Sequence, residues 1–325
     1  MEQRRLGKTG FEVSEIGLGC WQLGGGFGPL ADTTANAILK RARDLEVNLW
    51  DTADVYGGGK SESLIGDFAD RRGVHVITKF GRNGELFPRF RVSKAKIKES
   101  VEGSLKRLRV ETLDLLQLHC LPAELLADGE IFEWLVDLRQ DGLIRNFGAS
   151  VETVEEGLIA MRHPELATLQ VIFNLFRQDA AKALLPTAQQ NDVGIIVRLP
   201  LASGLLSGKF GKNQQFSPKD HRNFNRDGDS FNVGETFSGL PFEKGVELTE
   251  TLKGLAPRGW PLSHLALRWI LDHPAVSTVI AGVSRPEQLQ DNVAAAGKEP
   301  LDPGLTEKLA EFYHERVRPL VRGEI

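Results

Sequence analysis

The sequence lacks the features that mark several large classes of protein. It has only two cysteines, Cys20 and Cys120, and no CxxC pair, which argues against a disulfide framework and a structural zinc site. No apolar run reaches the roughly 18 residues that span a membrane, and the longest candidate, "VGIIVRLPLASGLL", is interrupted by Arg198 and Pro200. The N-terminal segment "MEQRRLGKTG" is charged and has no apolar stretch of a signal peptide. These absences predict a cytoplasmic protein of a reducing compartment.

An excess of positive charge is also absent. The formal net charge is -4, so no basic field predicts a nucleic-acid partner. Hydrophobic residues make up 41% of the chain and charged residues 26%, which is typical of a soluble globular protein. We therefore expect a small-molecule partner and no metal ion, while the sequence leaves the oligomeric state open.

Short apolar runs alternate with amphipathic segments along most of the 325 residues. The first segment, "RRLGKTGFEVSEIGLG", turns at Gly7 and Gly10, which predicts a hairpin followed by a strand that ends near Leu18. Seven further runs follow: "VNLWDT", "VHVITKF", "LDLLQLH", "IRNFGAS", "TLQVIFN", "VGIIVRLP" and "VSTVIAG". Strands buried on both faces read as continuous apolar runs of this kind. The pattern predicts a single (β/α)₈ TIM barrel over residues 1–325, with an N-terminal β-hairpin cap and long loops on its C-terminal face.

A doubly wound open sheet is the competing architecture. No GxGxxG follows the first strand, and the partial match at Gly26, Gly28 and Ala31 has no strand directly before it. The polar stretch 208–239 is too long for an ordinary connector, which favours a lid or a partly disordered loop.

The stretch "DTADVYGGGKSE" resembles a phosphate loop only at first sight. A P-loop would need glycine where Asp54 stands, so the match fails. The preferred interpretation is a flexible glycine loop followed by a helix that Ser61 caps.

Ionisable residues end three consecutive predicted strands: Asp51, Lys79 and His119, with Tyr56 in the loop after the first. Each alone suits an ordinary structural role, but residues at the carboxyl ends of barrel strands converge on one site. A tyrosine hydroxyl has a pKa near 10, which a nearby lysine lowers and burial raises, so we expect the lysine to lower the pKa by a reduced net amount. We therefore predict Tyr56 as a general acid aimed at a carbonyl, with Lys79 and Asp51 tuning it and His119 orienting the substrate oxygen. A bound hydride donor must complete the reaction.

The chain resembles the aldo-keto reductase superfamily over essentially its full length. The matching signatures are "RRLGKTGFEVSEIGLGCW", "DTADVYG", "ITKFG", "SLKRLRVETLDLLQLH", "IRNFGAS" and "VIAGVSRPEQLQDN". It is most similar to the bacterial branch of potassium-channel β-subunit-like and IolS-like reductases. The resemblance implies NADPH-dependent reduction of an aldehyde or ketone, or reversible alcohol or sugar oxidation, and assigns the same four catalytic residues.

The resemblance also implies a cofactor site across the barrel mouth, for NADPH more than for NADH. It places Gly19, Cys20, Trp21 and Asp51 near the nicotinamide or ribose, and the substrate beside Trp21, Tyr56, His119 and Cys120. The other implied cofactor contacts are Ser150, Gln170, Arg198, Leu201, Ser203, Gly204, Lys209, Gly282, Ser284, Arg285, Gln288 and Asn292. The helix start at Pro286 is expected to offer free N–H groups to a 2′-phosphate, with Arg285 adding charge.

Two positions depart from the family pattern. Val151 stands where an asparagine usually holds the carboxamide, and Arg198 stands where an aromatic residue usually stacks on the nicotinamide. Because the charge of Arg198 disfavours a nicotinamide cation, we hypothesise a preference for NADPH over NADP⁺.

Two other functions remain as alternatives. Lys79 at a strand end suits Schiff-base chemistry, although Asp51 would keep it protonated. A cofactor-binding redox sensor or regulatory subunit with little turnover would keep the same fold. Arg82, Arg89 and Arg91 could contact an anionic or sugar substrate, but a solvated charged loop is the preferred interpretation.

Overall fold

A closed barrel of eight parallel strands forms the centre of the molecule. The computed structural model describes residues 1–82 and 92–325, and Arg89 and Arg91 lie outside them. The strands follow one another around the barrel in the order β10-β3-β4-β5-β6-β7-β8-β9. They are β3 (Ile16–Gly19), β4 (Leu49–Asp51), β5 (His75–Phe80), β6 (Leu113–His119), β7 (Ile144–Ser150), β8 (Thr168–Ile172), β9 (Gly194–Arg198) and β10 (Val276–Gly282). The predicted TIM-barrel class is confirmed.

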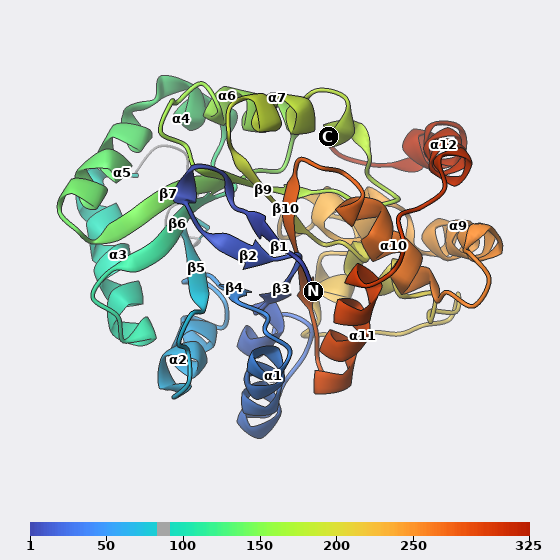
Figure 1. Ribbon diagram of the computed structural model, residues 1–325, viewed down its shortest axis with the longest axis horizontal. Coiled ribbons are helices and arrows are strands. Elements are labelled where there is room, and N and C mark those ends of the chain that lie inside the picture. The colour runs from blue at the N-terminus through green and yellow to red at the C-terminus, as the bar shows by residue number, and fades with distance from the viewer. Residues whose placement is uncertain (83–91) are drawn as a thin grey trace.

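Helices surround the barrel (Figure 1). They are α1 (Asp32–Asp44), α2 (Lys60–Asp67), α3 (Lys94–Leu108), α4 (Ala123–Asp128), α5 (Glu130–Gln140), α6 (Val154–Ala160), α7 (Leu184–Gln190), α8 (His221–Phe224), α9 (Phe242–Leu255), α10 (Leu262–Leu271), α11 (Pro286–Ala296) and α12 (Pro303–Phe312). Local capping sets several starts: Ser93 accepts the Lys96 N–H before α3, and Thr153 forms a capping box with Glu156 at α6. None of the described helices combines the length and apolarity that crossing a membrane requires.

The start of α2 differs from the prediction. The helix begins at Lys60 after Gly59, which has a left-handed φ of 92°, so the expected Ser61 cap is wrong. Ser61 is instead fully buried, and its hydroxyl donates to the Cys20 carbonyl (2.9 Å) and accepts from Thr52 (2.8 Å). The residue therefore fastens α2 beneath the mouth of the barrel.

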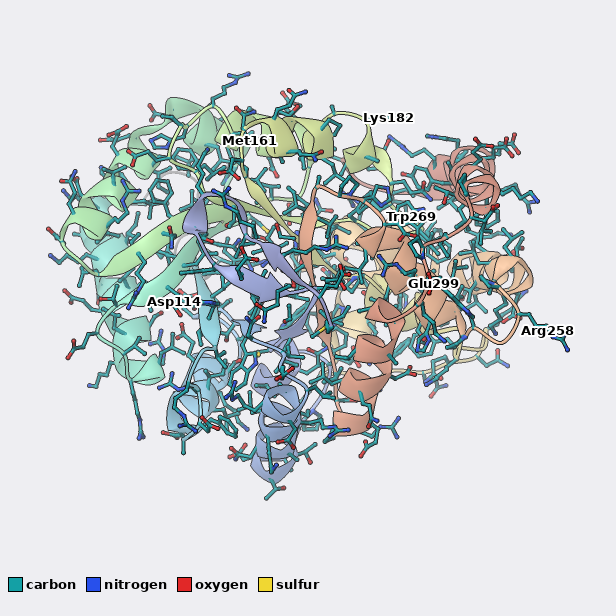
Figure 2. The ribbon with its side chains drawn as sticks, in the orientation of Figure 1. Asp114, Met161, Lys182, Arg258, Trp269 and Glu299 are labelled. Atoms are coloured by element: carbon teal, nitrogen blue, oxygen red, sulfur yellow. The ribbon has the colours of Figure 1, made fainter. Side chains whose placement is uncertain are left out.

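The hairpin of β1 (Gln3–Arg5) and β2 (Glu12–Ser14) closes the N-terminal end of the barrel, as predicted. Figure 1 shows it lying across the centre of the ring. Leu6 and Val13 pack there with a small inner core of Leu49, Ile77, Leu115, Ile196 and Ile280. The larger apolar core fills the space between strands and helices, while charged side chains such as Lys182, Arg258 and Glu299 lie around the outside (Figure 2). With the bottom plugged, a ligand would reach the barrel interior from the C-terminal face.

The stretch 208–239, which we call the cover segment, is built from short elements. It contains α8 and two 3₁₀ turns, Val233–Glu235 and Phe237–Gly239. The N–H of His221 donates to the Gly26 carbonyl (3.2 Å), and the N–H of Phe237 donates to the Ser203 hydroxyl (3.2 Å). The segment is therefore tied to two sides of the barrel mouth, which fits the lid interpretation better than partial disorder.

Candidate active site

Four polar side chains form a connected layer inside the upper barrel. Asp51 ends β4, Lys79 lies on β5, Gln117 on β6 and Gln170 on β8, and each is at most 2% exposed. The Lys79 Nζ donates to Asp51 Oδ2 (2.6 Å), while the Gln170 amide donates to Asp51 Oδ1 (2.7 Å) and to Gln117 Oε1 (3.0 Å). The layer fixes Asp51 from two sides, so this carboxylate has little freedom to move.

Tyr56 is placed above this layer by the loop after β4. Its hydroxyl accepts a hydrogen bond from Lys79 Nζ at 3.4 Å, and the same ammonium donates to the Thr52 carbonyl (2.8 Å). The ring stacks on Trp21 with centroids 5.9 Å apart, and it meets His119 edge-on at the same separation. The four residues that the strand-end pattern predicted as catalytic therefore meet at one point.

Burial opposes the expected tuning of Tyr56. Burial raises the pKa of its hydroxyl above the ordinary value, and the charge of Lys79 only partly offsets that effect. Burial would lower the pKa of the Lys79 ammonium, but Asp51 and Tyr56 outweigh it and raise the pKa. The expectation that Lys79 outweighs burial and lowers the pKa of Tyr56 is therefore wrong, because burial is the larger effect. Lys79 still favours the ionised hydroxyl, and it stays charged itself.

His119 ends β6 as a neutral side chain. Burial, together with the cations Arg82 and Lys79, lowers the pKa of its imidazole well below the ordinary value. Its Nδ1 is buried and has no hydrogen-bond partner in the described structure. A neutral imidazole beside the Tyr56 ring can hydrogen-bond a ligand oxygen without adding charge.

A cleft of about 520 Å³ runs away from these residues along the barrel mouth. One end is lined by Trp21, Tyr56, Arg82, His119 and Glu235, and the other by Lys209, Ser284, Gln288, Asp291 and Asn292. Between them the wall includes Gly19, Asp51, Gln170, Arg198, Leu201, Ser203, Gly204 and Gly282. Most of the residues implied by resemblance thus share one continuous cleft.

Five predicted site residues do not line the cleft. Cys20 and Cys120 are buried, and burial raises the pKa of the Cys120 thiol to about 12. Ser150 is buried beside the Cys120 sulfur (3.9 Å), and Lys79 lies beneath Tyr56. Arg285 is exposed at the start of α11. Of the five, Lys79 reaches the site through Tyr56, and Arg285 lies in sequence between cleft residues Ser284 and Gln288.

Two N–H groups immediately before α11 are already hydrogen-bonded. The Gln288 Oε1 accepts from the Ser284 N–H (2.8 Å) and the Arg285 N–H (3.1 Å). A capping side chain thus occupies these donors. An anion at this end would depend on side chains or would have to displace the Gln288 amide.

Several cleft residues were missed by the sequence reasoning. They come mainly from the cover segment and its contacts: Gln22, Gly26, Phe27, Phe210, Arg222, Phe224, Phe231, Glu235, Ser263 and Asp291. No periodic pattern marks them, because a long irregular segment has none. The one available signal was the length of the segment itself.

Glu235 is the most connected of these residues. Its Oε1 pairs with Arg82 Nη1 (2.8 Å) and Arg198 Nη1 (3.0 Å), and its side chain is 2% exposed. Burial would raise the pKa of this carboxyl, but the two guanidinium groups overcome it and lower the pKa. Arg198 also donates to the Val151 carbonyl (3.1 Å).

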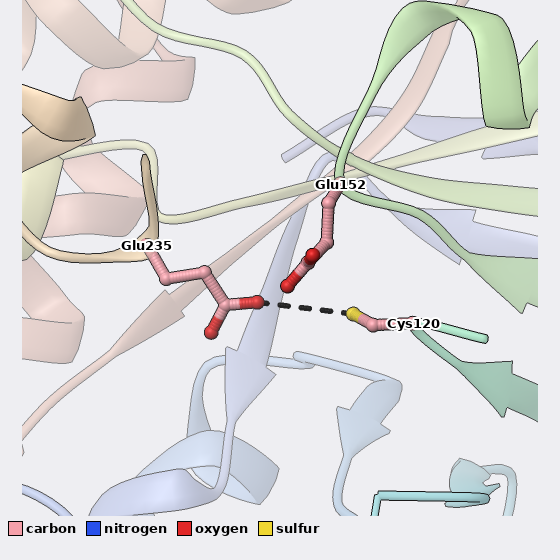
Figure 3. Close-up of side chains that lie close together, drawn as sticks. All are labelled: Cys120, Glu152 and Glu235. Atoms are coloured by element: carbon pink, nitrogen blue, oxygen red, sulfur yellow. Dashed lines mark hydrogen bonds between the residues drawn. The ribbon is translucent and has the colours of Figure 1, made fainter. Parts of the chain in front are cut away.

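Figure 3 shows Glu235 beside Cys120 and Glu152, with the thiol donating to Glu235 Oε1 at 3.8 Å. Their ligand atoms lie within 4.8 Å of one another, a spacing that suits a metal ion. The two guanidinium groups on Glu235 argue otherwise, since they bring positive charge to the place where a cation would sit. We interpret the group as part of an ion-pair network.

The cleft has the features that a nicotinamide dinucleotide needs. The neutral imidazole of His119 lies at one end, and Lys209 and several hydroxyl groups lie along the rest. Leu199, Ala202 and Ser203 have positive φ values of 52°, 47° and 54° at its edge. Strained backbone of this kind is concentrated at ligand sites. The donor set and shape therefore fit this cofactor.

Comparison with known proteins gives a consistent result. Residues 15–313 match the Aldo/keto reductase family. The chain is 33% identical to the aldo-keto reductase YhdN of Bacillus subtilis, covering 89% of this chain and 87% of that protein. It is similar in structure to the glycerol dehydrogenase AKR11B4 of Gluconobacter oxydans (TM-score 0.80, 30% identity, 100% and 98% coverage). It is also similar to the holo form of the aldo-keto reductase AKR11C1 from Bacillus halodurans (TM-score 0.76, 27% identity, 96% of each chain).

Proposed function

This chain belongs to the aldo/keto reductase family, and from that membership we propose that it reduces an aldehyde or ketone with NADPH, using Tyr56 as the general acid. The reverse reaction, oxidation of an alcohol, uses Tyr56 as the base. One barrel domain over residues 1–325 would carry both directions. The observation that carries the proposal is the contact series from Asp51 through Lys79 to the Tyr56 hydroxyl, at 2.6 and 3.4 Å.

Tyr56 would move the proton. A hydroxyl with a raised pKa is a poor acid by itself, so the neighbouring ammonium matters. Lys79 favours the tyrosinate that remains after the proton leaves, and Asp51 keeps Lys79 charged and in place. The acid and its stabilising cation are thus held by strand ends before a ligand arrives.

His119 and the cleft wall would position the reactants. The His119 imidazole lines the reacting end of the cleft next to the Tyr56 ring, and it would hydrogen-bond the carbonyl oxygen there. A bound nicotinamide cofactor would supply hydride to the carbonyl carbon. Residues near Gly19, Gln170 and Arg198 would hold its ring beside Tyr56, and Lys209, Ser284 and Asn292 would hold its far end.

Lysine chemistry has less support. A Schiff-base nucleophile must be neutral, but Lys79 is buried against a carboxylate that raises its pKa. A purely regulatory subunit has no need for the Tyr56, Lys79 and His119 arrangement. The relative from Gluconobacter oxydans is described as a glycerol dehydrogenase, which supports including alcohols among the substrates.

The test is a fluorescence titration of the purified protein with NADPH and with NADH. We expect tighter binding of NADPH, and Arg285→Ala should weaken it about tenfold through loss of one charge-assisted contact. NADH affinity should change less than about twofold, because NADH lacks the 2′-phosphate.

Arg162→Ala is the matched control. Arg162 is an exposed arginine between α6 and β8, at the opposite end of the barrel, and its loss should change neither affinity. Failure to bind either cofactor would overturn the reductase proposal. Equal affinities for NADPH and NADH, both unchanged by Arg285→Ala, would overturn only the preference for NADPH.

A further inference from the structure

Glu235 has no part in the acid/base scheme, yet it is built into the cleft. The carboxylate is 2% exposed and forms ion pairs with two arginines, Arg82 after β5 and Arg198 at the end of β9. All three residues line the reacting end of the cleft with Tyr56 and His119. Because this buried carboxylate pairs with two guanidinium groups in the cleft, we looked for a role in ligand binding as well as in fixing the cover segment.

We propose that Glu235 is a positioning residue that holds Arg82 and Arg198 and offsets one of their two positive charges, so that the oxidised cofactor is less disfavoured beside them. The inference rests on the proposed function, because it needs a nicotinamide ring next to Arg198. It also amends the hypothesis that the charge of Arg198 by itself disfavours NADP⁺.

The balance of charges gives the reason. Asp51 neutralises Lys79, and His119 is held uncharged, so neither changes the net charge at this end. Glu235 is the carboxylate that contacts both arginines, whereas Glu152 is 3.7 Å from Arg82 alone. Without Glu235, the looser contact with Glu152 would be the remaining carboxylate contact of the two guanidinium groups among the described residues. The nicotinamide ring is cationic when oxidised and neutral when reduced, so the excess charge would act on one form only.

The position of Glu235 is itself well determined. Its backbone carbonyl accepts from the Ser203 hydroxyl (3.2 Å), and the same hydroxyl accepts from the Phe237 N–H (3.2 Å). Arg82 lies against the Phe231 ring at 4.9 Å, within the same cover segment. The carboxylate therefore links the cover segment to the ends of two barrel strands, and it fixes both guanidinium groups at once.

The experiment compares the affinities of NADP⁺ and NADPH by isothermal titration at pH 6. For Glu235→Gln we expect NADP⁺ to bind about tenfold more weakly, from an uncompensated charge within about 10 Å, while NADPH changes less than about twofold. Adding Arg198→Gln should return the NADP⁺/NADPH ratio to within about twofold of the starting value. Arg198→Gln alone, which keeps the carboxylate, should shift the ratio towards NADP⁺.

Glu152→Gln is the control for a neighbouring carboxyl. The pKa of Glu152 is raised to about 7, first by burial and then by Glu235. At pH 6 it is therefore mostly protonated, and the substitution should leave the ratio within about twofold. If Glu235→Gln weakened the binding of both cofactors equally, the role of Glu235 would be purely structural and the inference would be overturned. The same conclusion would follow if Arg198→Gln left the NADP⁺/NADPH affinity ratio unchanged. Failure of the unmodified protein to bind either cofactor would instead overturn the proposed function.

Discussion

The reacting residues and the cover segment form the two sides of one cleft, but they are held in different ways. Asp51, Lys79 and His119 lie on neighbouring parallel strands, where register sets the spacing of their side chains. Glu235 and Phe231 come from a segment without strands and are placed by individual contacts such as the pair with Arg82.

The difference suggests that the strand side carries the chemistry and that the cover side contributes to ligand binding. The strand-borne side is held by hydrogen bonds among Asp51, Lys79 and two glutamines, which join neighbouring strands and also strands across the barrel. The cover side is attached to the barrel by ion pairs and a few hydrogen bonds. We therefore expect that residues on the cover side can be substituted without disturbing the barrel. Substitutions on the strand side should therefore change rate and stability. Substitutions on the cover side should change affinity.

The largest expected effect is at Tyr56. Tyr56→Phe removes the proton donor but keeps the ring that stacks on Trp21, so kcat for carbonyl reduction should fall by roughly 10²–10⁴. Cofactor affinity should stay within about threefold, since the hydroxyl serves the substrate oxygen. Steady-state kinetics with a carbonyl substrate, beside a fluorescence titration, measures both quantities.

The other tyrosine of the chain is the matched control. Tyr313 is buried beyond α12, where its hydroxyl donates to Asp179. Tyr313→Phe should lower stability by about 1 kcal/mol through loss of this bond and leave kcat within about twofold. A Tyr56→Phe enzyme as active as the Tyr313→Phe enzyme would mean that the proton comes from another group.

The second prediction compares the same substitution, lysine to methionine, at one position on each side of the cleft. Lys79→Met leaves the Asp51 carboxylate buried without its cation, which should cost about 3–5 kcal/mol of unfolding free energy. Lys209→Met removes an exposed lysine from the cleft wall and should cost less than about 0.5 kcal/mol. Urea denaturation, read as a change in midpoint at constant slope, gives both values. Similar small losses at the two positions would contradict the contrast between the sides.

Sequence patterns could predict the strand side because its geometry is regular. An apolar run that ends in Asp51, Lys79 or His119 places each residue at the same end of the barrel, whatever the loops do. The hairpin plug and the barrel could be predicted for the same reason. The sequence indicated that burial opposes Lys79 at Tyr56, but the extent of burial, which makes it the larger effect on the pKa, depends on the folded environment.

The cover side could not be predicted in this way. Glu235 meets Arg82 across 153 positions of sequence, and nothing in the surrounding "NVGETFSG" marks it as a partner. The departure at Arg198 was visible in the sequence, but its counter-ion was not. Gln288 shows the same limit, since the sequence did not predict that its side chain accepts from the Ser284 and Arg285 N–H groups just before the helix.

The smallest effect tests the border between the two sides, where Glu152 follows β7 and its carboxylate accepts from Asn232 of the cover segment (3.1 Å). The pKa of Glu152 is raised from 4.5 to about 7, mainly by burial. The folded state therefore favours the protonated form. Its stability falls as pH rises above the unfolded value near 4.5, and the penalty is complete once the folded carboxyl has ionised, above about pH 7.

Glu152→Gln removes that penalty. At pH 8 the variant should have a higher urea midpoint than the unmodified protein, and its free energy of unfolding should be larger by at most about 3 kcal/mol. At pH 5 the two proteins should unfold at nearly the same urea concentration. A stabilisation at pH 8 that is absent at pH 5 would place Glu152 with the cover side, whose charges are imperfectly paired. A loss of stability at pH 8 would mean that Arg82 and Asn232 hold the ionised carboxylate as firmly as Lys79 holds Asp51. Glu152 and Asn232 would then belong with the firmly held strand side, although Asn232 lies in the cover segment.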